Sequence, residues 1–192
     1  MEQIRKLETV IYGGAFNPPT LAHKAILEAC SEYAQNQQAD VWVMPSGDRS
    51  DKVIATPRVA RISYTTAMIE DAETLMVSPR IITSELDRPD LIETYDTLQE
   101  LKAIHPNRRF TFVFGADSTQ TMASWKNGKE LLEELPMLVV ERPGSLINPL
   151  ARHAVKLSIQ ALDISSTEVR RRIAAGVAID DLVSVSVAQL LQ

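Results

Sequence analysis

Short apolar, β-prone runs alternate with helix-like segments along the whole chain, and this alternation restricts the fold more than any other feature. We expect strands over residues 9–12, 41–44, 80–84, 110–114, 137–140 and 157–162. We expect helices over residues 20–35, 56–71, 94–104, 128–134, 166–175 and 183–191. Strands in such alternation form a parallel sheet with helices on both faces. The sequence therefore predicts an α/β fold: a Rossmann-like, doubly wound parallel sheet with C-terminal helices.

The length and charge of the chain restrict its class further. A chain of 192 residues suits one domain, and we expect residues 164–192 to form a C-terminal helical part of it. The net charge of −5 creates no general attraction to nucleic acid or to acidic membranes, so an anionic substrate needs local positive groups. No apolar run approaches the length of a membrane span, and the first ten residues do not resemble a signal peptide.

Cysteine and histidine usage points to a cytoplasmic protein without a structural metal. Cys30 is the single cysteine, so no intrachain disulfide is possible. The three histidines are not paired with cysteine or histidine at zinc spacing.

Residues 13–23, with the sequence GGAFNPPTLAH, follow a predicted strand and open a predicted helix. Gly13 and Gly14 allow a sharp turn and a close approach of the backbone to a ligand. The amino end of a helix then offers free N–H groups and a partial positive charge to phosphate. Thr20 and His23 are three residues apart, so they share one face of the first helical turn. A Gly-Gly turn by itself is usually an ordinary strand–turn–helix; the whole segment is far more specific.

A second phosphate-binding candidate lies in residues 164–170, with the sequence ISSTEVR. A Ser-Ser-Thr run before a helix is typical of an N-cap, and Glu168 is the acid of a capping box if Ser165 is the cap. Hydroxyl groups, exposed N–H groups and the Arg170 guanidinium form a suitable cradle for the outer phosphates of ATP. Thr56 followed by Pro57 is likewise predicted to cap and begin a helix.

The two phosphate segments together resemble the GxFxPx(T/H)xxH and ISSTxxR signatures of the adenylyltransferase and cytidylyltransferase superfamily. Every fixed position of both signatures matches. Many members carry glycine immediately before the histidine, where this chain has Ala22.

The middle of the chain resembles one branch of that superfamily, the nicotinate/nicotinamide mononucleotide adenylyltransferases. Several segments are similar to the family pattern: MPSG at residues 44–47 with Lys52 after it, Arg61 in the next helix, TYDTL at residues 94–98, GAD at residues 115–117 and RPG at residues 142–144. Trp125 stands eight residues after Asp117, as in the family's G-x-D…W pair. Glu93 departs from the aromatic residue that often precedes the threonine.

The resemblance implies a mechanism and a set of site residues. The mononucleotide phosphate attacks the α-phosphorus of ATP, and because that phosphate has a second pKa of about 6, no general base is needed. Mg²⁺ is expected to bridge ATP oxygens, with no carboxylate cage and no other metal site in the protein. Catalysis is assigned to His23 and Thr20. ATP is assigned to Gly13, Gly14, Ala15, Phe16, Ser165, Ser166, Thr167 and Arg170. The mononucleotide is assigned to Asn17, Lys52, Thr94, Asp117 and Trp125.

Several alternatives stay open at this point. A phosphopantetheine adenylyltransferase shares both phosphate signatures but lacks the Asp…Trp and Arg-Pro-Gly segments. The presence of Thr20, His23 and Arg170 argues against an inactive nucleotide-binding regulator. A dehydrogenase would need G-x-G-x-x-G, which is absent. The spacing of Asp117 and Trp125 favours nicotinate mononucleotide, whereas Asn17 and Thr20 also resemble forms that accept nicotinamide mononucleotide. The sequence does not indicate the oligomeric state.

Overall fold

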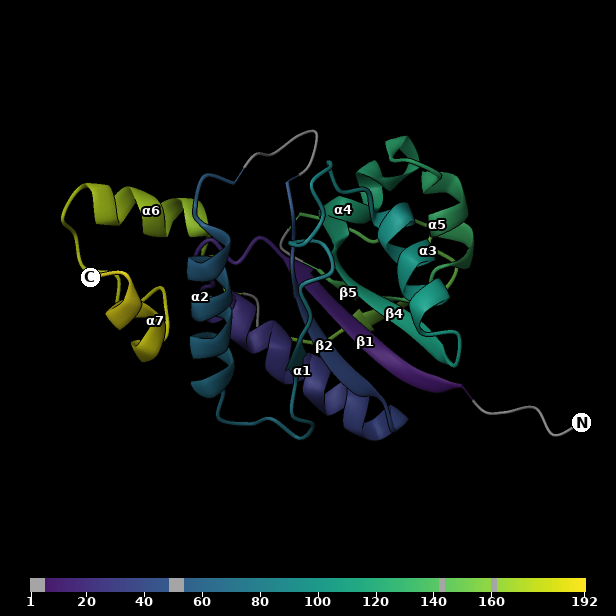
Figure 1. Cartoon of the computed structure of the whole chain (residues 1–192), viewed down its shortest axis with the longest axis horizontal. Helices are drawn as coiled ribbons and strands as arrows, with labels where there is room; N and C mark the ends of the chain where they lie inside the picture. The colour runs from purple at the N-terminus through teal and green to yellow at the C-terminus, as the bar shows by residue number, and fades with distance from the viewer. Residues whose placement is uncertain (1–5, 49–53, 142–143, 160–161) are drawn as a thin grey trace, which may run out of the picture.

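One parallel sheet of six strands forms the centre of the molecule (Figure 1). The structure is a computed structural model that describes residues 6–48, 54–141, 144–159 and 162–192. The strand order is β3-β2-β1-β4-β5-β6, and every pair is parallel. The strands are β1 (Leu7–Gly14), β2 (Asp40–Pro45), β3 (Arg80–Ile81), β4 (Arg108–Gly115), β5 (Met137–Val140) and β6 (Ala154–Leu157). The order reverses between β1 and β4, which opens a crevice beyond their carboxyl ends.

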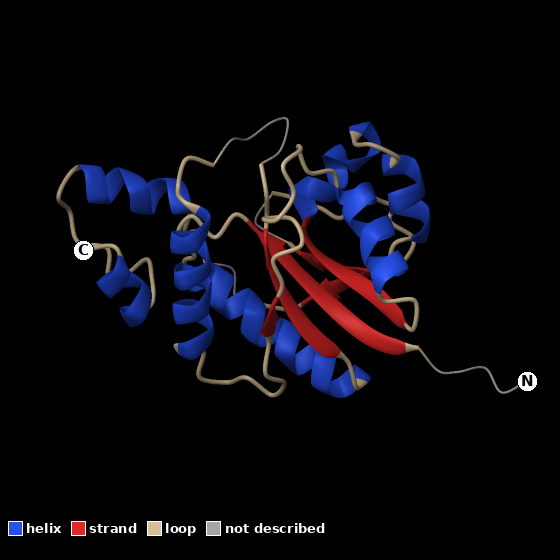
Figure 2. Ribbon diagram, in the orientation of Figure 1, coloured by secondary structure: helices blue, strands red, loops and turns tan. Residues whose placement is uncertain are grey.

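Helices cover both faces of this sheet (Figure 2). They are α1 (Leu21–Gln37), α2 (Arg58–Glu70), α3 (Thr94–Ile104), α4 (Ala116–Thr121), the 3-10 helix η1 (Met122–Ser124), α5 (Gly128–Glu134), α6 (Ser166–Ala174) and α7 (Val185–Leu190). Helices α1 and α2 lie on one face, and α3, α4 and α5 lie on the other (Figure 1). Helices α6 and α7 extend beyond α2 at the C-terminal end of the fold. The predicted doubly wound architecture is confirmed.

Alternation along the strands produces two hydrophobic cores. Val10 and Tyr12 of β1 pack on the face of α1, with Leu27 and Cys30. Ile11, between them, packs on the opposite face, where α3 and α5 lie. Because both faces are buried, the inner strands read as almost continuous apolar runs. Burial also raises the pKa of the Cys30 thiol far above its ordinary value.

The sequence prediction differs from the structure at the edges of the sheet. The last strand is Ala154–Leu157, not residues 157–162, so that prediction is wrong beyond Leu157. Its bounds follow from pairing with β5, whose Met137 faces Ala154 and whose Val140 faces Leu157. At the other edge, β3 has two residues rather than the predicted five of residues 80–84.

The central elements agree more closely with prediction. Residues 94–104, 128–134 and 137–140 form α3, α5 and β5 with the predicted bounds. Helices α4 and η1, which directly follow β4, were not predicted. No helix in the described ranges is long and apolar enough to cross a membrane.

Candidate active site

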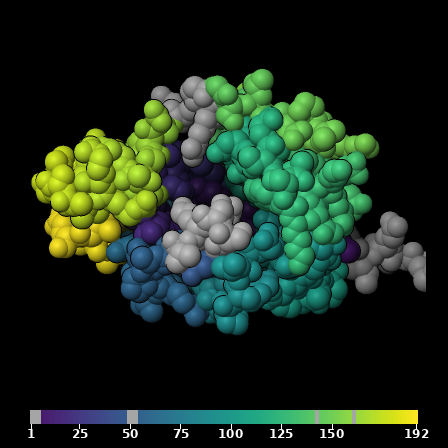
Figure 3. Space-filling view, turned by 90° about the horizontal axis from the view of Figure 1, so that it is seen from above, coloured from purple at the N-terminus to yellow at the C-terminus, as the bar shows by residue number. Residues whose placement is uncertain are grey.

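Several of the predicted site residues lie in the crevice at the carboxyl ends of β1, β2 and β4. A space-filling view into it shows a hollow between the C-terminal part and the segment around residues 100–150, with N-terminal residues at its floor (Figure 3). A cavity of about 220 Å³ lies here, lined by Gly13, Gly14 and Ala15 of the first loop, by Thr94, and by Gly115 and Trp125. This position is where doubly wound sheets bind nucleotides.

The first loop is fixed by a buried aromatic side chain. Phe16 has no exposed surface, and its φ of 44° lies in the left-handed region that non-glycine residues rarely adopt. Its ring turns back beneath Gly14, where an added Cβ would lie 3.0 Å from the ring. The close approach of the Phe16 ring therefore favours glycine at position 14.

Thr20 and His23 meet at the start of α1. Thr20 is the N-cap residue and is almost completely buried. Its Oγ1 lies 2.8 Å from His23 Nδ1, and its backbone N–H donates to the same nitrogen at 3.1 Å. The predicted pair is therefore brought together, but the two side chains also bond to each other. Because Nδ1 accepts the backbone N–H, a neutral His23 carries its proton on Nε2.

The second phosphate segment begins α6 and touches the first loop directly. Ser165 is the N-cap and accepts a hydrogen bond from the backbone N–H of Glu168 at 3.2 Å. Ser166 Oγ donates to the carbonyl oxygen of Pro18 at 2.8 Å. Arg170 Nη1 donates to the carbonyl oxygen of Asn17 at 2.6 Å, and its Nη2 donates to Thr167 Oγ1 at 3.1 Å. Two segments about 150 residues apart in sequence thus form one polar surface.

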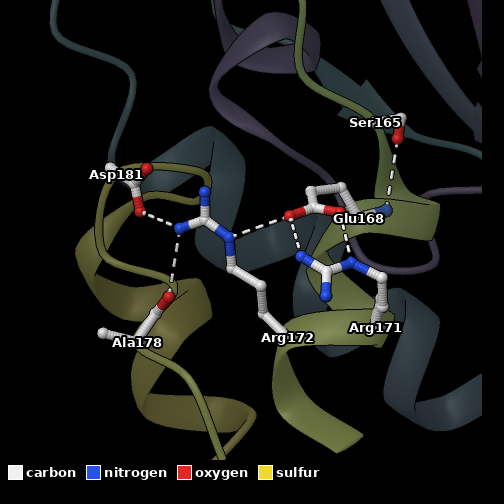
Figure 4. A network of polar contacts seen from close by, with 6 residues as sticks. All are labelled: Ser165, Glu168, Arg171, Arg172, Ala178 and Asp181. Carbon is white, nitrogen blue, oxygen red and sulfur yellow. Dashed lines mark hydrogen bonds and ion pairs between the residues drawn. The ribbon is translucent and has the colours of Figure 1, made fainter. Parts of the chain in front are cut away.

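A network of charged side chains holds α6 in place (Figure 4). Glu168 accepts hydrogen bonds from Arg171 (2.7 Å) and from Arg172 (3.0 Å). Arg172 continues to Asp181 at 2.7 Å, which ties α6 to the loop before α7. The hydrogen bonds from Arg171, followed by those from Arg172, lower the pKa of Glu168 to about 2. The carboxylate of the predicted capping box therefore pairs with two arginines.

Helix α7 is bound in turn to the end of α2. Asp71, the C-cap of α2, accepts hydrogen bonds from the Ser186 hydroxyl (2.7 Å) and from its backbone N–H (2.8 Å). Burial opposes ionisation of Asp71, but the hydrogen bonds from the Ser186 hydroxyl and backbone N–H contribute to a net lowering of its pKa. The C-terminal part thus rests on α2 through polar contacts as well as the buried Val187 and Ala188.

The predicted mononucleotide residues are only partly brought together. Thr94 begins α3 and lines the cavity, and Trp125 lines it from the turn after η1, with its ring 6.0 Å from that of Phe114. Asp117 is exposed in the first turn of α4 and is not among the residues that line the cavity. Lys52 and the Arg-Pro of the predicted RPG turn lie outside the described residues.

Arg61 is a buried cation next to the first loop. It is 3% exposed, and its Nη1 donates to the carbonyl oxygens of Ser46 (2.6 Å) and Ala15 (3.3 Å). Its Nε has no hydrogen-bond partner among the described residues. Burial lowers the pKa of Arg61, and the nearby Asp48 carboxylate acts in the opposite direction. Arg61 therefore joins the carboxyl ends of β1 and β2 and places positive charge beneath the crevice.

The crevice offers donors and cations rather than a carboxylate cluster. In the described part of the chain, no three His, Cys, Asp or Glu side chains are grouped to hold a metal ion. A larger cavity of about 450 Å³ lies at the opposite end of the sheet, beside Leu98, Arg108 and Leu131. It contains none of the described site residues, so the chemistry belongs to the crevice.

Comparison with known proteins agrees with this geometry. The model of the cytidylyltransferase-like family matches residues 11–172. A probable nicotinate-nucleotide adenylyltransferase of Exiguobacterium sibiricum is 32% identical over 184 residues, which cover 95% of this chain and 94% of the relative. Another, from Albidiferax ferrireducens, is 30% identical and covers 94% and 93% of the two chains. The chain belongs to the cytidylyltransferase-like family, and within it to the nicotinate-nucleotide adenylyltransferases.

A solved structure supports the same assignment. The nicotinic acid mononucleotide adenylyltransferase of Plasmodium falciparum, complexed with NaAD, superposes with a TM-score of 0.83 at 26% identity. The match covers 96% of this chain and 94% of that one. The similarity therefore spans both halves of the crevice, including the C-terminal part.

Sequence reasoning missed or misread three residues of this adenylyltransferase site. Thr56 does not cap α2, whose N-cap is Pro57; its hydroxyl donates instead to Asn17 Oδ1 at 2.6 Å. Glu85 is buried beside the cavity and accepts a hydrogen bond from Thr97 Oγ1 at 2.9 Å. Arg61 was predicted only as a match to the family pattern, and neither its burial nor its hydrogen bonds were predicted. The partners of all three lie 12 or more residues away in sequence, so no local pattern indicates them.

Proposed function

We propose that this chain transfers the adenylyl group of ATP to nicotinate mononucleotide, giving deamido-NAD and pyrophosphate. The observation that carries the proposal is the contact between the two phosphate segments: Arg170 of α6 binds the Asn17 carbonyl of the first loop. The two segments assigned to the ATP phosphates are therefore in contact, and the first of them also lines the cavity that Trp125 lines, which supports the proposal. The names of the relatives support the same reaction.

The ATP side of the crevice suits a chain of phosphates. Gly13, Gly14, Ala15 and Phe16 supply the turn that brings the backbone close to the nucleotide, and α1 points its amino end at the same place. Ser165, Ser166, Thr167 and Arg170 are assigned to the β- and γ-phosphates, since a guanidinium and hydroxyl groups are strong donors to phosphate oxygens.

His23 and Thr20 are assigned to the α-phosphate and the leaving oxygen. The Thr20 backbone N–H donates to His23 Nδ1 at 3.1 Å, so a neutral His23 ring carries its proton on Nε2, and we assign this N–H to a phosphate oxygen. A donor held in advance near developing negative charge lowers the barrier without reorganisation during the reaction. Thr20 thus orients the His23 ring through its backbone N–H and its hydroxyl.

The mononucleotide side suits a flat, electron-poor ring that carries a carboxylate. Trp125 offers an indole face to the pyridine ring. Thr94, the first residue of α3, brings a hydroxyl and the free N–H groups of a helix amino end to the cavity. Lys126, next to Trp125, already pairs with Asp96 at 2.7 Å, which offsets part of its charge. Asn17, Asp117 and Lys52 complete the proposed mononucleotide contacts.

The reaction needs positioning more than proton transfer. An oxygen of the mononucleotide phosphate forms a bond to the α-phosphorus, and the bond from that phosphorus to the bridging oxygen breaks as pyrophosphate leaves. Side chains of the crevice align the two anions and offset their repulsion. Mg²⁺ bound to the ATP phosphates would supply additional charge neutralisation, while the hydroxyl and guanidinium groups of the crevice bind phosphate oxygens.

Product analysis with both mononucleotides tests the proposal. Purified protein with ATP and Mg²⁺ is given nicotinate mononucleotide or nicotinamide mononucleotide, and dinucleotide and pyrophosphate are measured separately. We expect equal amounts of deamido-NAD and pyrophosphate with the nicotinate substrate, and a lower kcat/KM with the nicotinamide substrate.

Two results would contradict the proposal in different ways. A higher kcat/KM with nicotinamide mononucleotide would keep the adenylyl transfer but reverse the substrate. Absence of dinucleotide with either substrate, together with product from phosphopantetheine, would assign the crevice to a different acceptor. The Trp125→Ala variant tests the assignment of the mononucleotide to this cavity. It should weaken binding of the mononucleotide by about 1–3 kcal/mol, seen as a higher KM, and should change the KM for ATP much less.

A further inference from the structure

The Thr56 hydroxyl makes a contact that no sequence motif accounts for. It donates to Asn17 Oδ1 at 2.6 Å, across 39 residues of sequence, and both residues are partly buried. Thr56 lies two residues after Ile54, which lines the cavity assigned to the mononucleotide. The segment that leads into α2 is therefore fastened to the first loop beside that cavity.

Asn17 connects this contact to the ATP side. Its carbonyl oxygen accepts the hydrogen bond from Arg170 Nη1, and Arg170 also binds Thr167. Thr56, Asn17, Arg170 and Thr167 thus form a continuous chain of hydrogen bonds from the edge of the cavity to the second phosphate segment. Asn17 follows the buried, left-handed Phe16 and precedes the buried Pro18, so its backbone has little freedom to absorb a shift.

The orientation of the Asn17 side chain follows from the same contact. Because Oδ1 receives the Thr56 hydroxyl, the Nδ2 amide is directed away from Thr56. This amide makes no hydrogen bond to the described residues. It remains a donor for a phosphate oxygen, whereas a freely rotating amide could present its oxygen to the anion instead.

We propose that Thr56 is a positioning residue that couples the two substrates: its hydrogen bond to Asn17 links the mononucleotide cavity to the Arg170 side of the crevice. A mononucleotide that contacts Ile54 also favours the position in which Thr56 binds Asn17, and Asn17 then presents its carbonyl to Arg170. Coupling of this kind is reciprocal, so each substrate strengthens the binding of the other. The inference rests on the proposed function.

The test compares three substitutions. Thr56→Val keeps the shape of the side chain and removes the hydroxyl, and Thr56→Ser restores the hydroxyl. Thr66→Val is the matched control, because Thr66 lies in α2, the helix that begins after Thr56, and its hydroxyl donates to the Ile62 carbonyl of its own turn at 3.0 Å. Binding of α,β-methylene-ATP is measured by calorimetry with and without saturating nicotinate mononucleotide, alongside kcat and both KM values.

In the wild-type protein we expect nicotinate mononucleotide to tighten binding of the ATP analogue. Thr56→Val should lower that enhancement by about 2–10-fold, the range for one lost hydrogen bond, and Thr56→Ser should recover it to within about twofold. Thr66→Val should keep the wild-type enhancement, and all three variants should unfold at similar temperatures. A change of fold alone would not reduce the enhancement while leaving binding of the analogue by itself intact.

Three outcomes would overturn the proposal: no enhancement in the wild type, an unchanged enhancement in Thr56→Val, or equal losses in Thr56→Val and Thr66→Val. Failure of the proposed function is recognised separately, because wild-type protein would then form no dinucleotide from nicotinate mononucleotide. The two failures are distinguishable because one is read from the wild type alone and the other from the comparison of variants.

Discussion

The two phosphate segments of the crevice are held by different forces. In the first loop, Phe16, Thr20 and Ala22 are buried, and the loop follows the central strand β1 directly. In the second segment, Ser165, Thr167 and Arg170 are exposed, and Val169 is the buried residue of α6. Packing therefore fixes the first loop, whereas hydrogen bonds and ion pairs hold most of the second segment.

The contrast suggests a division of labour between the two halves of the site. Packed side chains resist displacement because interiors are as dense as crystals, so the group assigned to the reacting phosphate is kept in one place. Exposed ion pairs contribute little individually and rearrange at small cost. The α6 segment is thus suited to admit ATP and release pyrophosphate, and the first loop is suited to catalysis.

Replacing Phe16 by alanine tests the packed half most severely. The side chain is completely buried and supports a left-handed turn, so we expect unfolding free energy to fall by about 3–5 kcal/mol. Urea denaturation measures the loss. Leu146→Ala is the control, since Leu146 is 73% exposed and its loss should have little effect. A small loss for Phe16→Ala would show that the first loop is not held by packing.

Replacing His23 by alanine separates catalysis from stability within the same loop. We expect kcat to fall about 10²–10³-fold, the range for a lost donor to transition-state charge, while the protein still folds. His153→Ala should keep full activity, because His153 is exposed and lies next to β6, away from the crevice. More than half of the wild-type kcat in His23→Ala would remove His23 from the mechanism.

Replacing Arg170 by alanine tests the exposed half. We expect ATP binding to weaken by about 1.5–3 kcal/mol, as for a lost charge-assisted hydrogen bond, and mononucleotide binding to weaken less. Calorimetry with α,β-methylene-ATP gives the first value directly. Arg152→Ala is a suitable control, because Arg152 is exposed and faces only Glu133 at 3.9 Å. Equal weakening for both substrates would place Arg170 outside the ATP-phosphate site.

The smallest expected effect is the acid sensitivity of α6. Hydrogen bonds from Arg171 and then Arg172 lower the pKa of Glu168 from the ordinary 4.5 to about 2. The stabilisation is therefore complete above pH 4.5 and is lost as the pH falls toward 2. Hydrogen exchange should show α6 losing protection over this range before β1 does.

The Glu168→Gln variant isolates the contribution of this carboxylate. It should weaken the protection of α6 at neutral pH and make it less dependent on pH between 4.5 and 2, since residue 168 no longer titrates. Asp71, whose pKa is also lowered by its hydrogen bonds to Ser186, is present in both proteins and belongs to the common background. An identical pH profile in the variant and the wild type would show that Glu168 does not hold α6.

The sequence by itself determined the architecture and the location of both phosphate segments. Apolar runs such as residues 110–114 and 137–140 can be buried on both faces only in a covered parallel sheet, and this requirement is local to the pattern. The segments from Gly13 to His23 and from Ser165 to Arg170 can each be recognised from their own sequence and the neighbouring strand or helix. Lys52 and Asp117 stay predictions for the mononucleotide.

Only the tertiary structure decided how the two halves meet. The bounds of β6 depend on the length of its partner strand β5. Arg61 is buried because the carbonyls of Ala15 and Ser46 accept its hydrogen bonds, and Thr56 has its role because its hydroxyl reaches Asn17. A hydroxyl before a proline is interpreted as a helix cap because the local sequence offers it no other hydrogen-bond partner. In the fold, a carboxamide oxygen 39 residues away lies within 2.6 Å, and that long-range contact changes which group the threonine binds.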